Sequence, residues 1–142
     1  MTPGETWTVE RRALQGLVAV LACIPIATGL AGALFGIAAY GHPISHAVDL
    51  DSHGRYLSGL LLAIGLGFWS AIPAIEAQGP RIRLLTAIVI IGGLARLGGA
   101  IAVGLPSSGM IGGLVMELVV TPALAIWRES LDRRSPTPAT PR

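Results

Sequence analysis

The sequence has few charged residues, no lysine and a single cysteine. Only 13% of its 142 residues are charged, about half the share found in a soluble domain. All ten basic residues are arginine, which is typical of a GC-rich bacterial genome, and the net charge of +2 is too small to indicate nucleic-acid binding. Cys23 alone allows neither an intrachain disulfide nor a CxxC redox pair. These absences exclude a soluble domain, a nucleic-acid-binding protein and a disulfide scaffold.

Catalytic motifs are also missing. The apolar stretches contain no histidine, so they offer no axial ligand for a membrane-buried haem. No nucleophile–base constellation, phosphate-binding loop or zinc motif is present. We therefore expect a non-enzymatic protein without a cofactor.

Long apolar runs are what the chain has in abundance, and its mean hydropathy is +0.68. A helix needs about 20 apolar residues to cross a bilayer. Four runs are about this long or longer, at residues 13–40, 56–75, 82–105 and 110–127. The connection at 106–109 is short, so the last two spans are antiparallel neighbours. The sequence predicts an all-α membrane protein, a four-transmembrane-helix antiparallel bundle.

Polar segments flank this transmembrane domain, which we place at residues 11–128. Residues 1–10 are expected to be a cytoplasmic lead, and residues 129–142 a disordered, Pro-rich cytoplasmic tail. Arg11-Arg12 before an apolar run also fits a signal peptide, and Val20–Cys23 faintly resembles a lipoprotein cleavage box. The apolar run continues to Tyr40, however, well beyond a signal h-region of 7–15 residues. We therefore expect the first span to be retained.

Arginine is distributed unevenly between the loops. The N-terminal segment, the second loop and the tail hold eight arginines, whereas the first loop holds only Arg55 and the third loop none. Basic residues accumulate on the cytoplasmic side of a membrane protein. The three tryptophans fall at the same ends as the arginines, and tyrosines fall at the opposite ends, as in interfacial belts. We expect a multi-pass protein of the bacterial inner membrane with both termini in the cytoplasm.

Two local features bear on the first two spans. Gly32 and Gly36 are one turn apart and form a small-residue seam for a neighbouring helix. Asp51 or Ser52 can cap the second span by accepting its free N–H groups.

Two opposite charges lie inside the third and fourth spans. A charge at the bilayer centre costs roughly 2.5–3.5 kcal/mol on insertion scales. Arg96 lies nine residues before the end of its span and Glu117 seven residues after the start of the next, which places both ~10–13 Å below the same end. Each shares a helical stripe with small residues, Gly92 and Gly113 respectively, where backbones approach closely. The sequence predicts that Arg96 and Glu117 face each other inside the bundle.

Two roles for this pair stay open. It can be an ion pair that only fixes helix register. Alternatively, it can form a polar pocket open to the outer face, with Arg96 contacting an anion or headgroup and Glu117 exchanging a proton. Arg55, Tyr56 and Ser58 near the outer end of the second span would extend that pocket.

All three histidines lie in the first polar loop, with two aspartates among them: His42, His46, His53, Asp49 and Asp51. Imidazole and carboxylate together can bind Zn²⁺. The spacing matches no ligand motif, and Pro43 disfavours a helix that would put His42 and His46 on one face. We expect a solvated loop and no metal site.

Several motifs together resemble one known family. They are Arg12-Ala-Leu-Gln, Pro25 with Gly29 and Gly32, Asp51-Ser-x-x-Arg55-Tyr-x-x-Gly59, Gly92-Gly-x-x-Arg96, Gly104-x-Pro106, and Glu117 with Pro122 and Trp127. Their order and spacing over residues 11–128 resemble the bacterial four-helix membrane family catalogued as domain of unknown function 4345. The resemblance implies four transmembrane helices and recurring polar positions at Ser52, Arg55, Arg96 and Glu117, but no reaction. This family also looks distantly like the DoxX-type four-helix proteins.

Together these observations favour a non-enzymatic membrane module whose candidate polar pocket contains Arg96, Glu117, Arg55, Tyr56 and Ser52. It would bind a lipid or small molecule, or serve as an accessory subunit in contact with the bilayer and with a membrane-protein partner or a second copy. One alternative is a DoxX-like protein associated with redox or quinone chemistry, against which the lack of paired cysteines and intramembrane histidines counts. Another is a small proton-coupled transporter in which Glu117 carries the proton.

Overall fold

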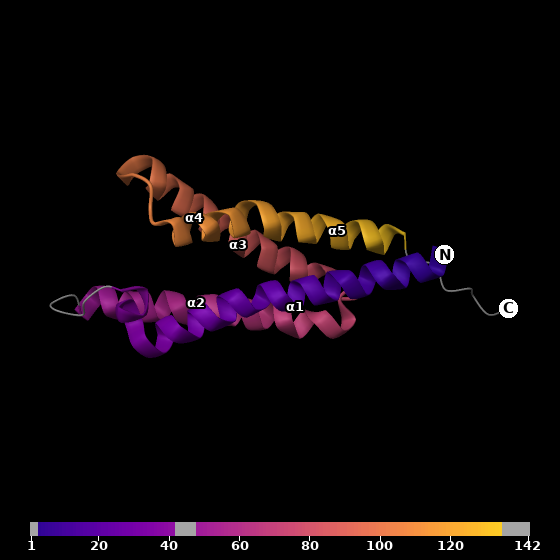
Figure 1. Ribbon diagram of the computed structural model, residues 1–142, viewed down its shortest axis with the longest axis horizontal. Helices are drawn as coiled ribbons and strands as arrows, with labels where there is room; N and C mark the ends of the chain where they lie inside the picture. The colour runs from indigo at the N-terminus through magenta and orange to yellow at the C-terminus, as the bar shows by residue number, and fades with distance from the viewer. Residues whose placement is uncertain (1–2, 42–47, 135–142) are drawn as a thin grey trace. The chain divides into compact units, whose positions relative to one another are not determined.

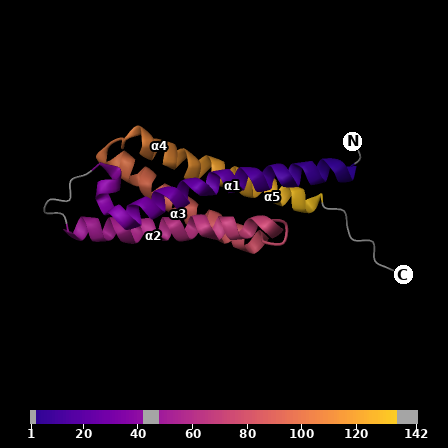
Figure 2. The ribbon, with the colours of Figure 1, turned by 60° about the horizontal axis from the view of Figure 1, so that its bottom comes forward.

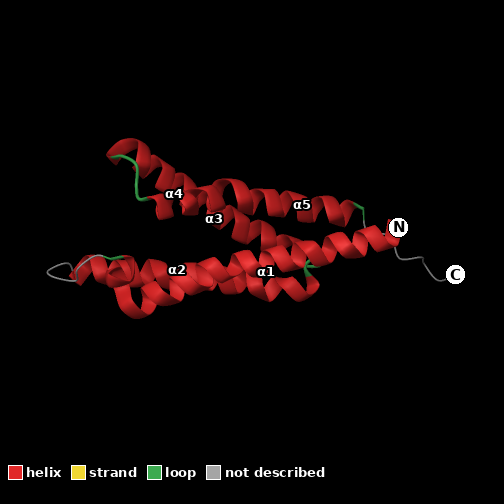
Figure 3. Cartoon of the chain, in the orientation of Figure 1, coloured by secondary structure: helices red, strands yellow, loops and turns green. Residues whose placement is uncertain are grey.

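All regular elements in the part of the chain that the structure describes are helices (Figure 3). The structure is a computed structural model that describes residues 3–41 and 48–134. The predicted all-α class is confirmed. The elements labelled in Figure 1 and the short helices between them are α1 (Pro3–Phe35), the 3₁₀-helix η1 (Gly36–Tyr40), α2 (Val48–Ala71), the 3₁₀-helix η2 (Ile72–Ala74), α3 (Gly79–Val103), α4 (Ser108–Val115), the π-helix η3 (Met116–Val120) and α5 (Thr121–Arg133).

Four stretches of helix are long and apolar enough to cross a membrane. They are Glu5–Tyr40, Val48–Ala74, Gly79–Val103 and Ser108–Arg133, with mean hydropathies of 2.3, 1.7, 2.0 and 1.9. Large apolar side chains such as Leu34, Ile91 and Val119 are exposed, and lipid is the solvent that suits such surfaces. The chain is therefore a multi-pass membrane protein with four helices of spanning length.

The first and last helices extend beyond the predicted spans. α1 begins at Pro3, so the polar lead expected at residues 1–10 is helical from that residue onward. α5 continues to Arg133, so residues 129–133 belong to a helix and not to the expected tail. Polar contacts hold both extensions, because Trp7 Nε1 donates to the carbonyl of Leu131 at 3.4 Å. Hydropathy does not detect a helix end that is stabilised in this way. Residues 135–142 lie outside the described residues.

The second helix also begins earlier than predicted. α2 begins at Val48, ahead of the expected start at Tyr56, and Asp51 lies in its first turn. The carboxylate of Asp51 accepts the N–H of Ile37 at 2.9 Å. Asp51 therefore satisfies a donor at the end of the preceding helix and does not serve as the expected cap of its own.

The chain divides into two compact units, and the first, which we call the first-hairpin unit, is Gly16–Pro73. Within it, α1 and α2 lie side by side and antiparallel (Figures 1 and 2). A Cβ added to Gly29 would lie 2.5 Å from the main-chain nitrogen of Leu62, and one added to Gly32 would lie 2.1 Å from Ser58 Oγ. Glycine is thus required where the two helices approach. Of the predicted seam, Gly32 lies at this approach, whereas Gly36 begins η1 and faces Asp51.

A polar cluster closes one end of this hairpin. Arg55 Nη1 donates to the carbonyls of Ala33 and Leu34 at 3.1 and 2.8 Å, and Arg55 Nε donates to Asp51 Oδ2 at 2.7 Å. The last carbonyls of an α-helix have no partner within the helix, and here the arginine of the next helix supplies one. Gly36 begins η1 with a φ of +63°, so the chain turns sharply immediately after these carbonyls.

Gly36→Ala is expected to destabilise the protein by about 2–3 kcal/mol. The substitution forces a side chain into the left-handed region, and its Cβ would lie 1.8 Å from Asp51 Oδ1. The matched control is Gly59→Ala in α2, because a Cβ there meets nothing within 4 Å. Thermal unfolding in detergent should show a loss for Gly36→Ala alone, and equal midpoints for the two variants would contradict this role of Gly36.

The second unit, which we call the second-hairpin unit, combines Met1–Gln15 with Ala74–Arg142. In it, α3 runs antiparallel to the continuous path of α4, η3 and α5 (Figure 1). Close approaches of Gly93 to Leu118 and of Gly79 to Arg128 mark the helix seam. This seam positions the charged residues described next.

Candidate functional site

Arg96 and Glu117 form a bidentate ion pair within the second-hairpin unit. Arg96 Nε donates to Glu117 Oε2 and Nη2 donates to Oε1, both at 3.1 Å. The planar guanidinium matches the two oxygens of a carboxylate in this geometry. The side chains are 36% and 20% exposed respectively, so the pair lies at the edge of the seam and not in a sealed core. The two residues face each other as the sequence predicts.

The remaining guanidinium nitrogen has a poorer partner. Arg96 Nη1 donates to Met110 Sδ at 2.8 Å, and a thioether sulfur is only a weak acceptor. Gly113 leaves space beside this nitrogen, because a Cβ there would lie 3.9 Å from Nη1. A ligand oxygen could therefore replace the sulfur with a gain in hydrogen-bond strength.

Glu117 lies in a π-helical turn, where hydrogen bonds join residues five apart. Both the N–H and the Oγ1 of Thr121 donate to the carbonyl of Met116, the hydroxyl at 2.8 Å. Pro122 follows directly and has no N–H. In an α-helix the carbonyl of Glu117 would accept the N–H of Thr121, but that N–H donates to Met116. In a π-helix it would accept the N–H of residue 122, which is proline. The carbonyl of Glu117 therefore receives neither hydrogen bond. Such turns are frequent at functional sites.

Close packing against α3 also holds this turn. A Cβ added to Gly93 of α3 would lie 2.7 Å from Leu118 Cδ2 and 2.9 Å from Glu117 Cβ. The glycine thus lets α3 approach the π turn closely enough for Arg96, one turn further along, to reach the carboxylate.

The other residues of the predicted pocket lie in the first-hairpin unit. The guanidinium of Arg55 is engaged by Asp51 and by carbonyls of α1. Tyr56 is 63% exposed, and Ser52 is exposed as well. Ser58 is buried and hydrogen-bonded to Tyr40. The structure thus brings Arg96 and Glu117 together, and a pocket containing all the predicted residues remains a prediction.

The predicted absence of a metal site in the histidine loop also remains untested. His42 and His46 lie outside the described residues, and His53 belongs to α2, where its ring centroid is 6.5 Å from that of Tyr56. Among residues 3–41 and 48–134, no three His, Cys, Asp or Glu side chains gather as metal ligands.

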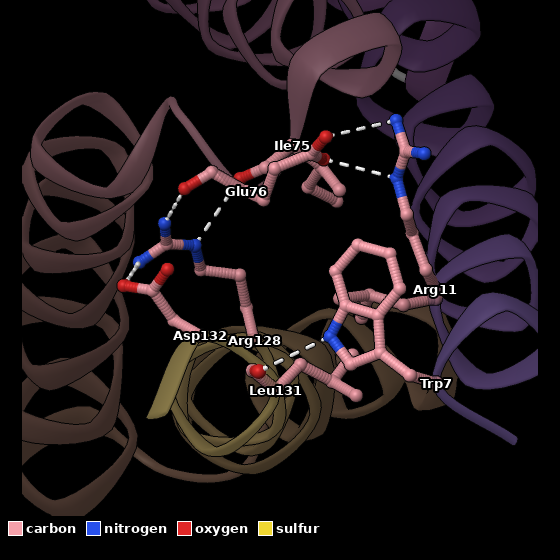
Figure 4. A pocket seen from close by; sticks show the side chains of 8 residues that line it. Trp7, Arg11, Ile75, Glu76, Arg128, Leu131 and Asp132 are labelled. Atoms are coloured by element: carbon pink, nitrogen blue, oxygen red, sulfur yellow. Dashed lines mark hydrogen bonds and ion pairs between the residues drawn. The ribbon is translucent and has the colours of Figure 1, made fainter. Parts of the chain in front are cut away.

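Arg128 forms a second polar centre that sequence reasoning missed. Its side chain is only 5% exposed, and it donates to the main-chain carbonyls of Ile75, at 3.1 Å, and Glu76 (Figure 4). Ion pairs to Glu129 at 3.2 Å and Asp132 at 3.5 Å neutralise its charge. The guanidinium therefore fastens α5 to the connection that precedes α3.

Neighbouring side chains complete this centre around a small hollow. Arg11 forms a bidentate pair with Glu76, and its guanidinium lies 5.8 Å from the ring centroid of Trp7 (Figure 4). The apolar parts of Leu14, Ile75 and Leu131 line the hollow as well. The polar groups that line the hollow already bind one another, so we interpret this centre as a structural contact and not as a ligand site. We call it the Arg128 clamp, because it fastens α5 to the connection before α3.

The sequence offers only a weak signal for this clamp. Arg128 directly follows Trp127 at the end of an apolar run, where arginine is usual in a membrane protein. The informative detail is Gly79: a Cβ there would lie 2.5 Å from Arg128 Nη1. That contact joins residues distant in sequence and becomes visible only when α3 and α5 are paired.

Comparison with known proteins yields a match to a family model. No curated protein and no solved structure matches the sequence. The family model described as domain of unknown function (DUF4345) matches residues 13–128, which include all four spans in large part and both Arg96 and Glu117. The chain therefore belongs to the DUF4345 family.

Proposed function

We propose that this protein is a non-enzymatic membrane module that binds the oxyanion of a lipophilic molecule, such as a lipid phosphate, at Arg96. In the ligand-free protein Glu117 holds the guanidinium in place. The ligand oxygen takes the position of Met110 Sδ at Nη1. The observation that carries this proposal is that Nη1 faces a weak acceptor at the edge of a membrane-spanning seam. Guanidinium is well suited to phosphate and carboxylate oxygens.

The test is native mass spectrometry of the delipidated protein in a maltoside detergent. Phosphatidic acid is the probe, diacylglycerol with the same acyl chains is its phosphate-free control, and inorganic phosphate shows whether the acyl chains are needed. We expect phosphatidic acid to bind and diacylglycerol not to bind. Arg96→Gln should weaken binding about tenfold or more, because a charge-assisted hydrogen bond is lost.

A matched variant separates site binding from general attraction to charge. Arg83 of α3 also forms an ion pair, with Glu129 at 2.8 Å, but at the other end of the helix. Arg83→Gln should leave the affinity for phosphatidic acid unchanged. Equal weakening by Arg83→Gln and Arg96→Gln, or equal binding of the two lipids, would refute the proposal.

A proton-coupled transporter is a second candidate, and the π turn that contains Glu117 is the observation in its favour. The bidentate contact with Arg96 has to break before the carboxyl can carry a proton. Proton-driven flux in proteoliposomes that disappears in Glu117→Gln would support this candidate over simple binding.

We also propose that both termini lie in the cytoplasm of a bacterial cell, on the basis of the arginine asymmetry. In a Cys23→Ser background, cysteines introduced at Ser45 and Ser108 should react with an impermeant thiol reagent added outside the cell. Cysteines at Gln78 and Ser135 should react only after the membrane is opened. The opposite labelling pattern would reverse the orientation.

A further inference from the structure

We infer that α4 is a gate over Arg96 that turns about the π-helical turn η3 when an oxyanion binds. This inference rests on the proposed function, since it describes how the same site is opened. It combines three features of the second-hairpin unit: the contact that covers Arg96, a hinge with two hydrogen-bond registers, and a difference in how firmly the two flanking helices are held.

The covering contact comes from α4 itself. Met110 lies in the first turn of α4 (Ser108–Val115), and its sulfur occupies Arg96 Nη1. An oxyanion cannot take this position while the sulfur stays there. Binding therefore requires the Met110 side chain, or the helix that carries it, to move away.

The hinge lies directly after α4. In the observed register, the N–H of Thr121 donates to Met116 O, and the carbonyl of Glu117 lacks a donor. In an α-helical register the same N–H would return to Glu117 O, four residues before it. In that register the carbonyl of Leu118 would lack a donor instead, because its partner would be Pro122, which has no N–H. Each register thus leaves one carbonyl of this turn unsatisfied, and the backbone hydrogen bonds do not decide between the two registers.

The ion pair favours the π register over the α register. In the π register Glu117 faces Arg96 and accepts two hydrogen bonds at 3.1 Å. A π turn holds one extra residue, so its loss would rotate the flanking helices relative to each other by roughly 100°. Glu117 would then leave Arg96. The pair and the π turn therefore stabilise each other, which makes the turn a two-state element.

The helices on the two sides of this hinge are held unequally. α5 is fixed by Arg128, which bonds to the carbonyls of Ile75 and Glu76 and is buried together with Leu131. None of the residues of α4 is buried. On its other side α4 follows a connection that begins at Gly104, whose φ of +120° only glycine adopts readily. A change of register would therefore move α4 and leave α5 in place.

A ligand couples to this motion through charge. An oxyanion on Arg96 competes with the Glu117 carboxylate for one guanidinium and repels it. The oxyanion therefore weakens both contacts that hold α4 against Arg96. One is the contact of Met110 Sδ with Nη1, and the other is the ion pair between Arg96 and Glu117. Oxyanion binding thus favours the register in which α4 has turned away.

The experiment measures the distance between two nitroxide labels by pulsed EPR in maltoside micelles. The labels occupy cysteines introduced at Gly112 of α4, where a Cβ meets nothing within 4 Å, and at Leu84 of α3, which is 62% exposed, in a Cys23→Ser background. Phosphatidic acid should shift the distance by a few Å, because a point on a helix surface lies ~5 Å from its axis and moves when the helix rotates. Diacylglycerol should cause no shift.

Two variants test the hinge without any ligand. Glu117→Gln and Arg96→Gln each remove the ion pair and should shift the distance in the lipid-free protein, whereas Arg83→Gln, which breaks a pair far from the hinge, should not. Because three independent conditions are compared, failure of one variant to fold leaves the test intact. An unchanged distance with phosphatidic acid and in the pair variants that fold would overturn the gate.

The outcomes separate the gate from the proposed function. If phosphatidic acid binds in an Arg96-dependent manner while the label distance stays constant, the binding function stands and the gate is wrong. If the pair variants shift the distance although no lipid or phosphate binds, the hinge is real and the proposed ligand is wrong.

Discussion

In maltoside micelles, Arg128→Met is expected to lower the thermal midpoint more than substitution of any other arginine in the described part of the chain. Methionine keeps much of the apolar stem but leaves the carbonyls of Ile75 and Glu76 without their donor. Asp132 would lose its partner as well. Breaking a buried, fully hydrogen-bonded charge costs roughly 3–5 kcal/mol, which corresponds to about 10 °C or more for a chain of this size.

Arg83→Met is the matched control for this substitution. Arg83 also pairs with Glu129, but its side chain is 59% exposed, so its loss should cost only a small fraction of that change. Gly79→Ala offers an independent check, because its Cβ would lie 2.5 Å from Arg128 Nη1 and displace the guanidinium. This variant should also lower the thermal midpoint. Equal midpoints for Arg128→Met and Arg83→Met would mean that Arg128 is not a clamp.

Removal of either member of the Arg96–Glu117 pair is expected to have unequal effects. Without Arg96, the carboxyl of Glu117 can take up a proton and become neutral in its apolar surroundings. Without Glu117, Arg96 stays charged, because guanidinium does not release its proton at accessible pH. Only the weak contact with Met110 would then remain. Glu117→Leu should therefore lower the folded yield and the thermal midpoint more than Arg96→Leu.

The double variant completes this thermodynamic cycle. Arg96→Leu/Glu117→Leu should recover part of the loss, since neither charge is left alone. Breaking a buried pair costs roughly 3–5 kcal/mol in soluble proteins, and snorkelling or water defects reduce this figure in a membrane. Thermal unfolding in detergent measures the coupling. Strictly additive losses, or equal losses for the two single variants, would show that the contact contributes nothing.

The number of spans and the central ion pair could be predicted because both are written in local patterns. Apolar runs of sufficient length identify helices that cross a membrane whatever their neighbours. Arg96 and Glu117 stand out because a charge within such a run needs a partner, and helical rise alone places them at the same depth. The contact between them can be predicted from two spans, 82–105 and 110–127, and the short connection at 106–109.

The remaining features depend on partners that a linear pattern does not identify. Asp51 looks like the cap of the helix that follows it, yet it binds the N–H of Ile37, because α2 begins before it. The π turn involves Thr121, whose N–H and hydroxyl both donate to the carbonyl of Met116, and Pro122, which has no N–H. No single one of these residues indicates it. The helical ends beyond the apolar runs depend on tertiary contacts such as that of Trp7 with Leu131.

The choice of partner by Arg128 has a consequence for how the family's sequences diverge. Arg128 binds main-chain carbonyls at residues 75 and 76, and every amino acid supplies the same carbonyl. A change of side chain at either position therefore requires no compensating change at residue 128. Arg96 and Glu117 bind through their side chains, so a change in one creates selection on the other. Correlated substitution in an alignment would reveal the pair at 96 and 117. The more deeply buried arginine would leave a trace at Gly79 and at its acidic neighbours Glu129 and Asp132, but none at the two positions whose carbonyls it binds.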